Sequence, residues 1–344
     1  MQKSIIFLFL VLFFLLSTFI FFHPAKNEAE IDQKILTQFK NLDDVHKYAW
    51  INEIGASEGP EVAWNYVVAA YTTPEGVVGN AHDMAHLVGQ LLFKKYGFKG
   101  LSTCTPIFAF GCYHGLMQVA FDKNKPEEFQ NKLVEAEKGC SAVGPTSSPS
   151  YWSCIHGIGH GVATFRDYKI DKSLADCSTL DKSISTYCYD GVFMEFSNSA
   201  APEFYKQSDP LYPCDTVDEA YKSACARAQV QVMKLRFGMS APAIADACLA
   251  GGNQTVAYHC VDAVGYSIAQ GSQGDSRQVL SGCNAIKEAA AAAQCLAAAA
   301  GELVFQDTLG WQQSATAICV SLAGSYKASC DERVESVKKS YGRN

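Results

Sequence analysis

Clusters of lysine and arginine are missing from this chain, which argues against a nucleic-acid partner. The 28 basic residues are outnumbered by 35 acidic ones, and the formal net charge is −7. Binding a phosphate backbone requires concentrated positive charge. Charged residues are sparse at 18%, whereas 48% of residues are apolar. The chain can therefore bury a sizeable core and is not typical of a disordered protein.

Several signatures of catalysis are absent as well. The chain has no glycine-rich phosphate loop, no G-x-S-x-G elbow and no C-x-x-C-H haem attachment site. Nucleotide binding, α/β-hydrolase chemistry and c-type haem consequently have no support in the sequence.

One long uncharged run, from Ile5 to Phe22, lies near the N-terminus. As a helix rising roughly 1.5 Å per residue, it nearly crosses the hydrocarbon core of a membrane. We interpret it as a single-pass signal anchor, with residues 1–4 in the cytoplasm and residues 23–30 as a linker. Lys3 before the run and acidic residues after it favour this orientation. A cleaved signal peptide is the alternative, although the residues around Ala25 form no convincing cleavage site.

Fourteen cysteines place the rest of the chain in an oxidising compartment outside the cell membrane. They come as seven couples, and the first members of successive couples are separated by 36, 37, 37, 34, 35 and 36 residues. Such a period is typical of two short helices and their turns. The couples are Cys104 and Cys112, Cys140 and Cys154, Cys177 and Cys188, Cys214 and Cys225, Cys248 and Cys260, Cys283 and Cys295, and Cys319 and Cys330.

Each repeat is predicted to contain a long and a short helix. The second cysteine lies inside a longer helical pattern, such as residues 215–236, 253–270 and 284–306, and the first ends a shorter one, such as 241–249 and 311–320. We call the longer one helix A and the shorter one helix B. The predicted fold is therefore an all-α solenoid of αα-hairpins, with about seven disulfide-stapled repeats of ~36 residues over positions 80–330.

Residues 31–79 lack cysteine but hold amphipathic runs, so we expect N-terminal capping helices there. The charged segment 331–344 is expected to form the C-terminal cap.

Two disulfide registers fit the repeat. Pairing within couples uses all fourteen cysteines, whereas pairing each second cysteine with the next first cysteine leaves Cys104 and Cys330 unpaired. We favour pairing within couples, which ties each helix B to the following helix A. Three residues after the second cysteine, six successive repeats carry Gly or Ala, which favours close helix contact: Gly115, Gly157, Gly191, Ala228, Ala263 and Ala298.

With its hairpin length and paired cysteines, the chain from Gly79 to Lys338 resembles the disulfide-bridged, tetratricopeptide-like αα-repeat proteins secreted by bacteria. The runs HDMAHLVG (82–89), GCYHG (111–115) and CIHGIGHG (154–161) look like those of a group of microbial membrane-anchored proteins. The second resemblance implies an anchored protein and no particular activity.

Histidines recur at equivalent positions of the repeats. When the A helices are aligned on their cysteine, the residues two and six positions later form a column one helical turn apart. Five of the eight histidines fall in this column, in three adjacent repeats, with Asn80 in the place of a cysteine in the first: His82, His86, His114, His156 and His160. The column loses this character after Asp190, which localises any site to the N-terminal half.

Imidazoles at positions i and i+4 share a helix face, so this column predicts a site for Zn²⁺ or another divalent metal. Asp190 is a candidate ligand, and Asp190 or Glu195 a candidate water-activating residue of a metal-dependent hydrolase. Glu195 lies roughly 140° round the helix from Asp190, which makes it the poorer candidate.

Two other interpretations of the column stay open. It forms either a buried ladder of hydrogen bonds between packed helices, or a polar groove that binds a protein, peptide or glycan as part of a non-enzymatic scaffold. The remaining histidines, His23, His46 and His259, fall outside the column.

Overall fold

The computed structural model describes residues 31–121, 123, 125–199 and 205–343. It divides into two compact units, one ending at Asn41 and the other beginning at Leu42. The described part of the first unit contains one helix, α2 (Gln33–Asn41). The predicted anchor at 5–22 and its flanking residues lie outside the described residues. Among the helices of the described ranges, none is both long and apolar enough to cross a membrane.

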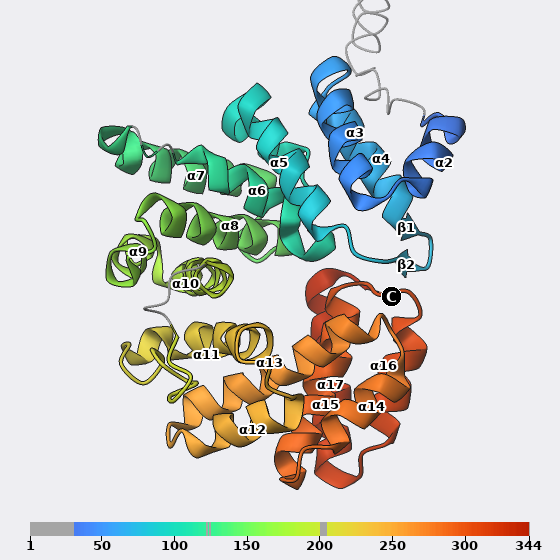
Figure 1. The fold of residues 1–344 in the computed structure, drawn as a ribbon, viewed down its shortest axis with the longest axis vertical. Helices are drawn as coiled ribbons and strands as arrows, with labels where there is room; N and C mark the ends of the chain where they lie inside the picture. The colour runs from blue at the N-terminus through green and yellow to red at the C-terminus, as the bar shows by residue number, and fades with distance from the viewer. Residues whose placement is uncertain (1–30, 122, 124, 200–204, 344) are drawn as a thin grey trace, which may run out of the picture. The chain divides into compact units, whose positions relative to one another are not determined.

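The second unit is built almost wholly of helices, which confirms the predicted all-α repeat fold (Figure 1). It opens with α3 (Asp44–Ser57) and α4 (Pro60–Tyr71), followed by a hairpin of two short antiparallel strands, β1 (Thr72–Thr73) and β2 (Gly76–Val77). The A helices are α5 (His82–Tyr96), α6 (Gly111–Ala120), α8 (Pro149–Phe165), α10 (Lys182–Asn198), α11 (Glu219–Leu235), α13 (Gln254–Ser272), α15 (Ala289–Phe305) and α17 (Gly324–Tyr341).

The B helices and short 3₁₀ turns lie between the A helices in the sequence, and one of the B helices, with 15 residues, is longer than the A helix α6 before it, with 10. The α-helices among them are α7 (Phe129–Val143), α9 (Ile170–Cys177), α12 (Ala241–Ala250), α14 (Ser276–Asn284) and α16 (Trp311–Val320), and the 3₁₀ turns are η1 (Gly97–Ser102), η2 (Phe108–Phe110) and η3 (Pro126–Glu128). Two repeats depart from the predicted hairpin. Cys104 follows the 3₁₀ turn η1, and Cys214 lies in a run of turns rather than at the end of an α-helix.

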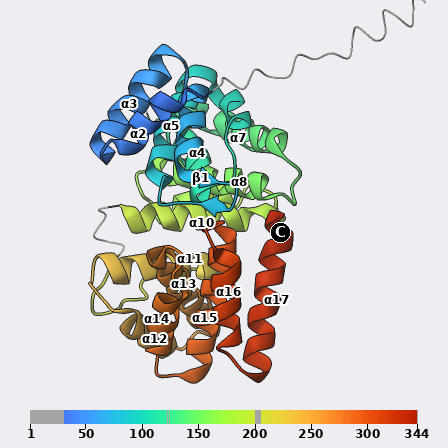
Figure 2. The same ribbon diagram turned by 90° about the vertical axis from the view of Figure 1, so that its right-hand side faces the viewer.

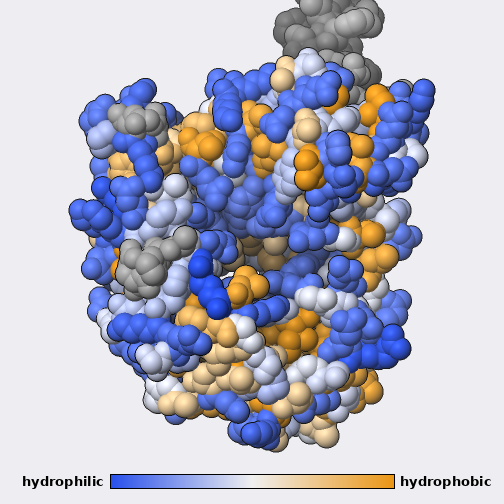
Figure 3. Space-filling model, viewed as in Figure 1, coloured by the Kyte–Doolittle hydropathy of each residue, from blue (hydrophilic) through white to orange (hydrophobic). Residues whose placement is uncertain are grey.

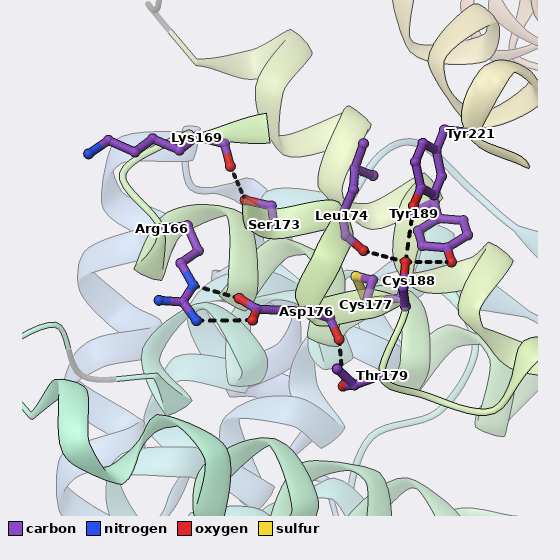
Figure 4. Close-up of a disulfide and its surroundings, with 11 residues drawn as sticks. Arg166, Lys169, Ser173, Leu174, Asp176, Cys177, Thr179, Cys188, Tyr189 and Tyr221 are labelled. Atoms are coloured by element: carbon purple, nitrogen blue, oxygen red, sulfur yellow. Dashed lines mark hydrogen bonds and ion pairs between the residues drawn. A yellow bond between two sulfur atoms is a disulfide. The ribbon is translucent and has the colours of Figure 1, made fainter. Parts of the chain in front are cut away.

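The cysteines pair within couples, in the favoured register. Figure 4 shows one of these staples, which joins Cys177 at the end of α9 to Cys188 in α10, with Cα atoms 5.7 Å apart. None of the described cysteines is free. Each bond closes a loop of 8 to 14 residues, and such closures stabilise a fold by about 2 to 4 kcal/mol each. Seven disulfides are typical of an oxidising environment.

Each A helix packs on the next one along the chain. Gly115 of α6 lies against the backbone of His86 in α5, and Gly191 of α10 lies against the backbone of His156 in α8. A methyl group at either glycine would overlap the carbonyl oxygen of that histidine. The small residue three positions after the cysteine therefore sets how closely these helices approach.

The stack of A helices closes into a ring, which was not predicted from the sequence. The helices follow one another round the ring in Figure 1, and the last ones return to the first, as Figure 2 also shows. A short parallel bridge joins the two ends, because the amide of Val77 donates to the carbonyl of Asp307 at 2.7 Å and the amide of Leu309 donates to that of Val77 at 3.0 Å. Phe110 and Phe305 pack edge to face with centroids 5.1 Å apart. The face viewed along the ring is hollowed near its middle (Figure 3).

The glycine contacts yield a test by substitution. Gly191→Ala should lower the melting temperature, because an overpacked helix contact costs about 1 to 3 kcal/mol, or several degrees for a domain of this size. Gly271→Ala is the matched control, because a methyl group there meets nothing within 4 Å. It should leave the melting temperature unchanged or slightly raised. Equal melting temperatures for wild type and Gly191→Ala would contradict the packing described.

Candidate metal centre

The five column histidines come together from three consecutive A helices. α5 supplies His82 and His86, α6 supplies His114, and α8 supplies the remaining two. His114, His156 and His160 are buried, with 1%, 8% and 1% of their surface exposed, and the pair on α5 is partly buried. The positional equivalence seen in the sequence is therefore a real proximity in space.

The histidines form two triads that could each hold a metal ion, and both triads include His114. One triad adds His82 and His86, and the other adds His156 and His160. Within each triad, one potential ligand atom from every residue lies within 4.8 Å of the others. The Nε2 atoms of His82 and His86 are 3.0 Å apart, and those of His156 and His160 are 3.2 Å apart. Two imidazoles bound to one zinc ion at 2.0 to 2.1 Å hold their nitrogens roughly 2.9 to 3.4 Å apart.

The outer contacts of the first pair favour one tautomer of each ring. His82 Nδ1 lies 2.8 Å from the carbonyl oxygen of Phe108, which can only accept, so Nδ1 carries the proton. His86 Nδ1 faces the side-chain oxygen of Gln118 at 3.4 Å and is also the donor. The orientation of the Gln118 amide follows from its nitrogen, which donates to the carboxylate of Glu195. In the tautomers with the proton on Nδ1 of both rings, the two Nε2 atoms present bare lone pairs to each other.

Glu195 orients the second pair. Its Oε2 accepts from His160 Nδ1 at 2.7 Å and from Gln118 at 3.2 Å, and its Oε1 accepts from Tyr168 at 3.3 Å. A carboxylate on the outer nitrogen of a histidine is the usual support of a metal-ligating imidazole. Gln118 thus connects the two triads, because it contacts Nδ1 of His86 on one side and the carboxylate that holds Nδ1 of His160 on the other.

The reach of Glu195 follows from the face it shares with Gly191, four residues earlier and one turn away. Gly191 marks the side of α10 that packs against α8, so Glu195 also points to α8 and its His160. Asp190 lies on another face of α10, so the angle between Asp190 and Glu195 does not show that Glu195 points to α8.

Asp190 lies outside both triads. Its Oδ1 accepts from Arg227 Nη2 at 2.5 Å and from Nε at 3.2 Å, forming an ion pair between α10 and α11. The structure therefore does not bring Asp190 into the histidine cluster. Three histidines fall outside the column. His46 is exposed and lies beside Asp43, and Nδ1 of His259 lies 3.3 Å from Nη1 of Arg227. His23 lies outside the described residues.

Two contributors to the site carry little signal in the sequence. Tyr168 follows the end of α8 with a positive φ of 58°. Phe108 takes part through its backbone carbonyl, in a turn where three successive residues that are not glycine have positive φ, of 53°, 47° and 68°. Such conformations cost about 1 to 3 kcal/mol each and persist where the surroundings fix them. Here the strained turn begins α6 and supplies the acceptor for His82.

Burial favours the neutral form of His82, His86, His114 and His156. It lowers the pKa of His82 and, together with the neighbouring His82 and His160, lowers that of His86 to about 3. The pKa values of His114 and His156 fall well below the usual value, again chiefly because of burial. For Glu195, burial raises the pKa, but the hydrogen bonds from His160, Gln118 and Tyr168 outweigh it, and the net shift is downward. Neutral imidazoles backed by an ionised carboxylate are the form in which histidine binds metals.

No family model, curated protein or solved structure matches this chain. The resemblances inferred from the sequence therefore stay predictions. Fold and site together define a disulfide-stapled ring of helical hairpins with a cluster of five histidines, three of them buried and two partly buried.

The lowered pKa values predict that the metal-free protein loses stability in acid. Unfolded histidines titrate near 6.5, so below that pH the unfolded chain takes up protons that the folded cluster does not. Stability should fall from about pH 6.5 toward pH 3, by at most about 2 kcal/mol at pH 5 for each histidine whose pKa is lowered, namely His82, His86, His114 and His156. Urea unfolding of metal-stripped protein at pH 7.5 and 5.0 measures this. His86→Gln should show a smaller difference, and equal stabilities of the wild type at both values would be inconsistent with neutral buried imidazoles.

Proposed function

We propose that this chain is a membrane-anchored, extracytoplasmic protein that binds a divalent transition metal through its histidine cluster. The observation that carries the proposal is the contact between the Nε2 atoms of His82 and His86, which are 3.0 Å apart, the separation of neighbouring ligands on one ion, while each Nδ1 faces an oxygen acceptor. Two lone pairs at that distance repel each other unless a cation lies beside both. Burial disfavours a proton as that cation, because it lowers the pKa of both residues.

His114 supports the same conclusion against a ladder of hydrogen bonds. Both of its ring nitrogens are buried and have no hydrogen-bond partner. A ladder requires each imidazole to find a donor or acceptor, and an unsatisfied buried polar group costs about 1 to 3 kcal/mol. A metal ion would satisfy the lone pairs of His114 and of the α5 pair together.

The donor set selects the class of metal. Imidazole nitrogen suits Zn²⁺, Cu²⁺, Ni²⁺ and iron, whereas Mg²⁺ and Ca²⁺ prefer oxygen ligands. Thiolates do not compete, because every described cysteine is in a disulfide. Zn²⁺ is the ion we propose first, since it forms tetrahedral sites with three imidazoles and one further ligand.

The proposal stops at metal binding because neither candidate catalytic carboxylate is free to activate water. Asp190 is held by Arg227, and Glu195 accepts from three side chains including His160. Glu195 is therefore assigned to positioning His160. The extracytoplasmic location is supported by the disulfides, and the anchor by the apolar run at 5–22. No contact in the described residues favours a protein, peptide or glycan ligand.

Metal content and thermal stability, measured together, test the proposal. Purified, oxidised wild type should contain zinc. Added zinc should stabilise the stripped protein by mass action, by about 2.7 kcal/mol at 100 times the Kd, and so raise its melting temperature. His160→Ala should lower the zinc content and shrink this rise. His46→Ala is the control, because His46 is exposed and outside the cluster, and it should behave as wild type.

A wild type that neither contains zinc nor responds to it would refute the proposal. In that case His160→Ala would still lower the melting temperature, because Glu195 would lose a buried partner. The pair of measurements therefore separates a metal centre from a purely structural hydrogen-bond network.

A further inference from the structure

His114 occupies the middle of the histidine cluster. Its helix, α6, packs on both α5 and α8, so its ring lies between the other four. The ring centroid of His114 is 5.4 and 5.2 Å from those of His82 and His86, and 4.8 and 4.4 Å from those of His156 and His160. By contrast, the rings of His86 and His160 are 6.5 Å apart. The ring of His114 is therefore closer to each of the other four rings than the rings of His86 and His160 are to each other.

One ion does not readily take all five imidazoles in this arrangement. Ligand nitrogens bound to one ion at 2.0 to 2.1 Å are at most about 4.2 Å apart, which is the distance between opposite ligands. The potential ligand atoms form two overlapping groups of three, each within 4.8 Å, rather than one group of five. Each outer pair has the nitrogen separation of neighbouring ligands on its own ion, 3.0 Å in one and 3.2 Å in the other.

From this geometry we infer that the centre holds two divalent metal ions, with His114 as a bridging ligand between them. The inference rests on the proposed function and extends it to a second ion. One ion binds His82, His86 and one nitrogen of His114, and the other binds His156, His160 and the second nitrogen. Both nitrogens of His114 are without a partner in the structure, as such a bridge requires.

Formation of the bridge releases one proton from His114. A neutral imidazole has one lone pair and one N–H, so binding of the second ion breaks that N–H bond and releases the proton to solvent. The electron pair of the broken bond becomes the new metal–nitrogen bond, and nothing is oxidised or reduced. The negative charge of the imidazolate and of Glu195 partly offsets the four positive charges of the ions.

Copper(II) is a suitable probe, because it binds imidazole most tightly among the first-row divalent ions and is paramagnetic. Full-length, oxidised and metal-stripped protein is titrated with copper(II), and bound copper is compared with the integrated electron paramagnetic resonance signal at low temperature. We expect two copper ions per chain and a signal well below the copper content, because spins coupled through a bridging imidazolate cancel. His86→Ala and His160→Ala, which each leave one triad intact, should bind one copper ion with full signal.

His114→Ala should restore a full signal for whatever copper it binds, and circular dichroism checks that it folds. One copper ion per wild-type chain with full signal would overturn the second ion and leave the proposed function standing. Two ions with full signal would overturn the bridge. No bound copper would remove the proposed function itself, so the two failures are distinguishable.

Discussion

Successive A helices in the first half of the ring touch backbone to backbone, and the proposed metal centre depends on that closeness. Gly115 lies on the backbone of His86, and Gly191 lies on that of His156. A larger residue at either glycine would push the two helices apart and move the histidines at equivalent positions away from one another. From α6 onward, disulfides hold the A helices to the segments that precede them, whereas α5 carries no cysteine.

The same contact explains which residues of the column take part. Repeats with glycine at this position, on α6, α8 and α10, bring histidine and glutamate together. Further round the ring the column changes to an ion pair of Asp262 with Arg333, at 2.6 Å, which serves packing between α13 and α17. Glu302 of α15 stands seven residues after its cysteine, as Glu195 does, but it is held by Gln270 and Gln306 rather than by histidine. The repeats therefore share the packing of their A helices but differ in the polar side chains that they carry at the column positions.

Much of the fold could be predicted from the sequence because period and spacing are local signals. The pairs of cysteines and the helix-forming segments between them predict the hairpins, and α16 has the bounds expected for 311–320. The closure of the ring depends on a small rotation per repeat that sums over the whole chain, and the sequence carries no direct signal for it. The contact of Phe110 with Phe305 could not be foreseen for that reason.

The five histidines of the site could likewise be predicted from their repeat positions, whereas their supporting partners could not. The angle between Asp190 and Glu195 on one helix does not indicate which face of α10 packs on α8, so the sequence does not predict the contact of Glu195 with His160. Phe108 contributes a carbonyl that every residue has, in a backbone conformation no propensity predicts. Zinc-edge X-ray absorption of the purified protein tests the central claim most directly. The account predicts a nitrogen shell at about 2.0 to 2.1 Å with imidazole scattering beyond it, and zinc bound only by water oxygen, or a sulfur shell at about 2.3 Å, would contradict it.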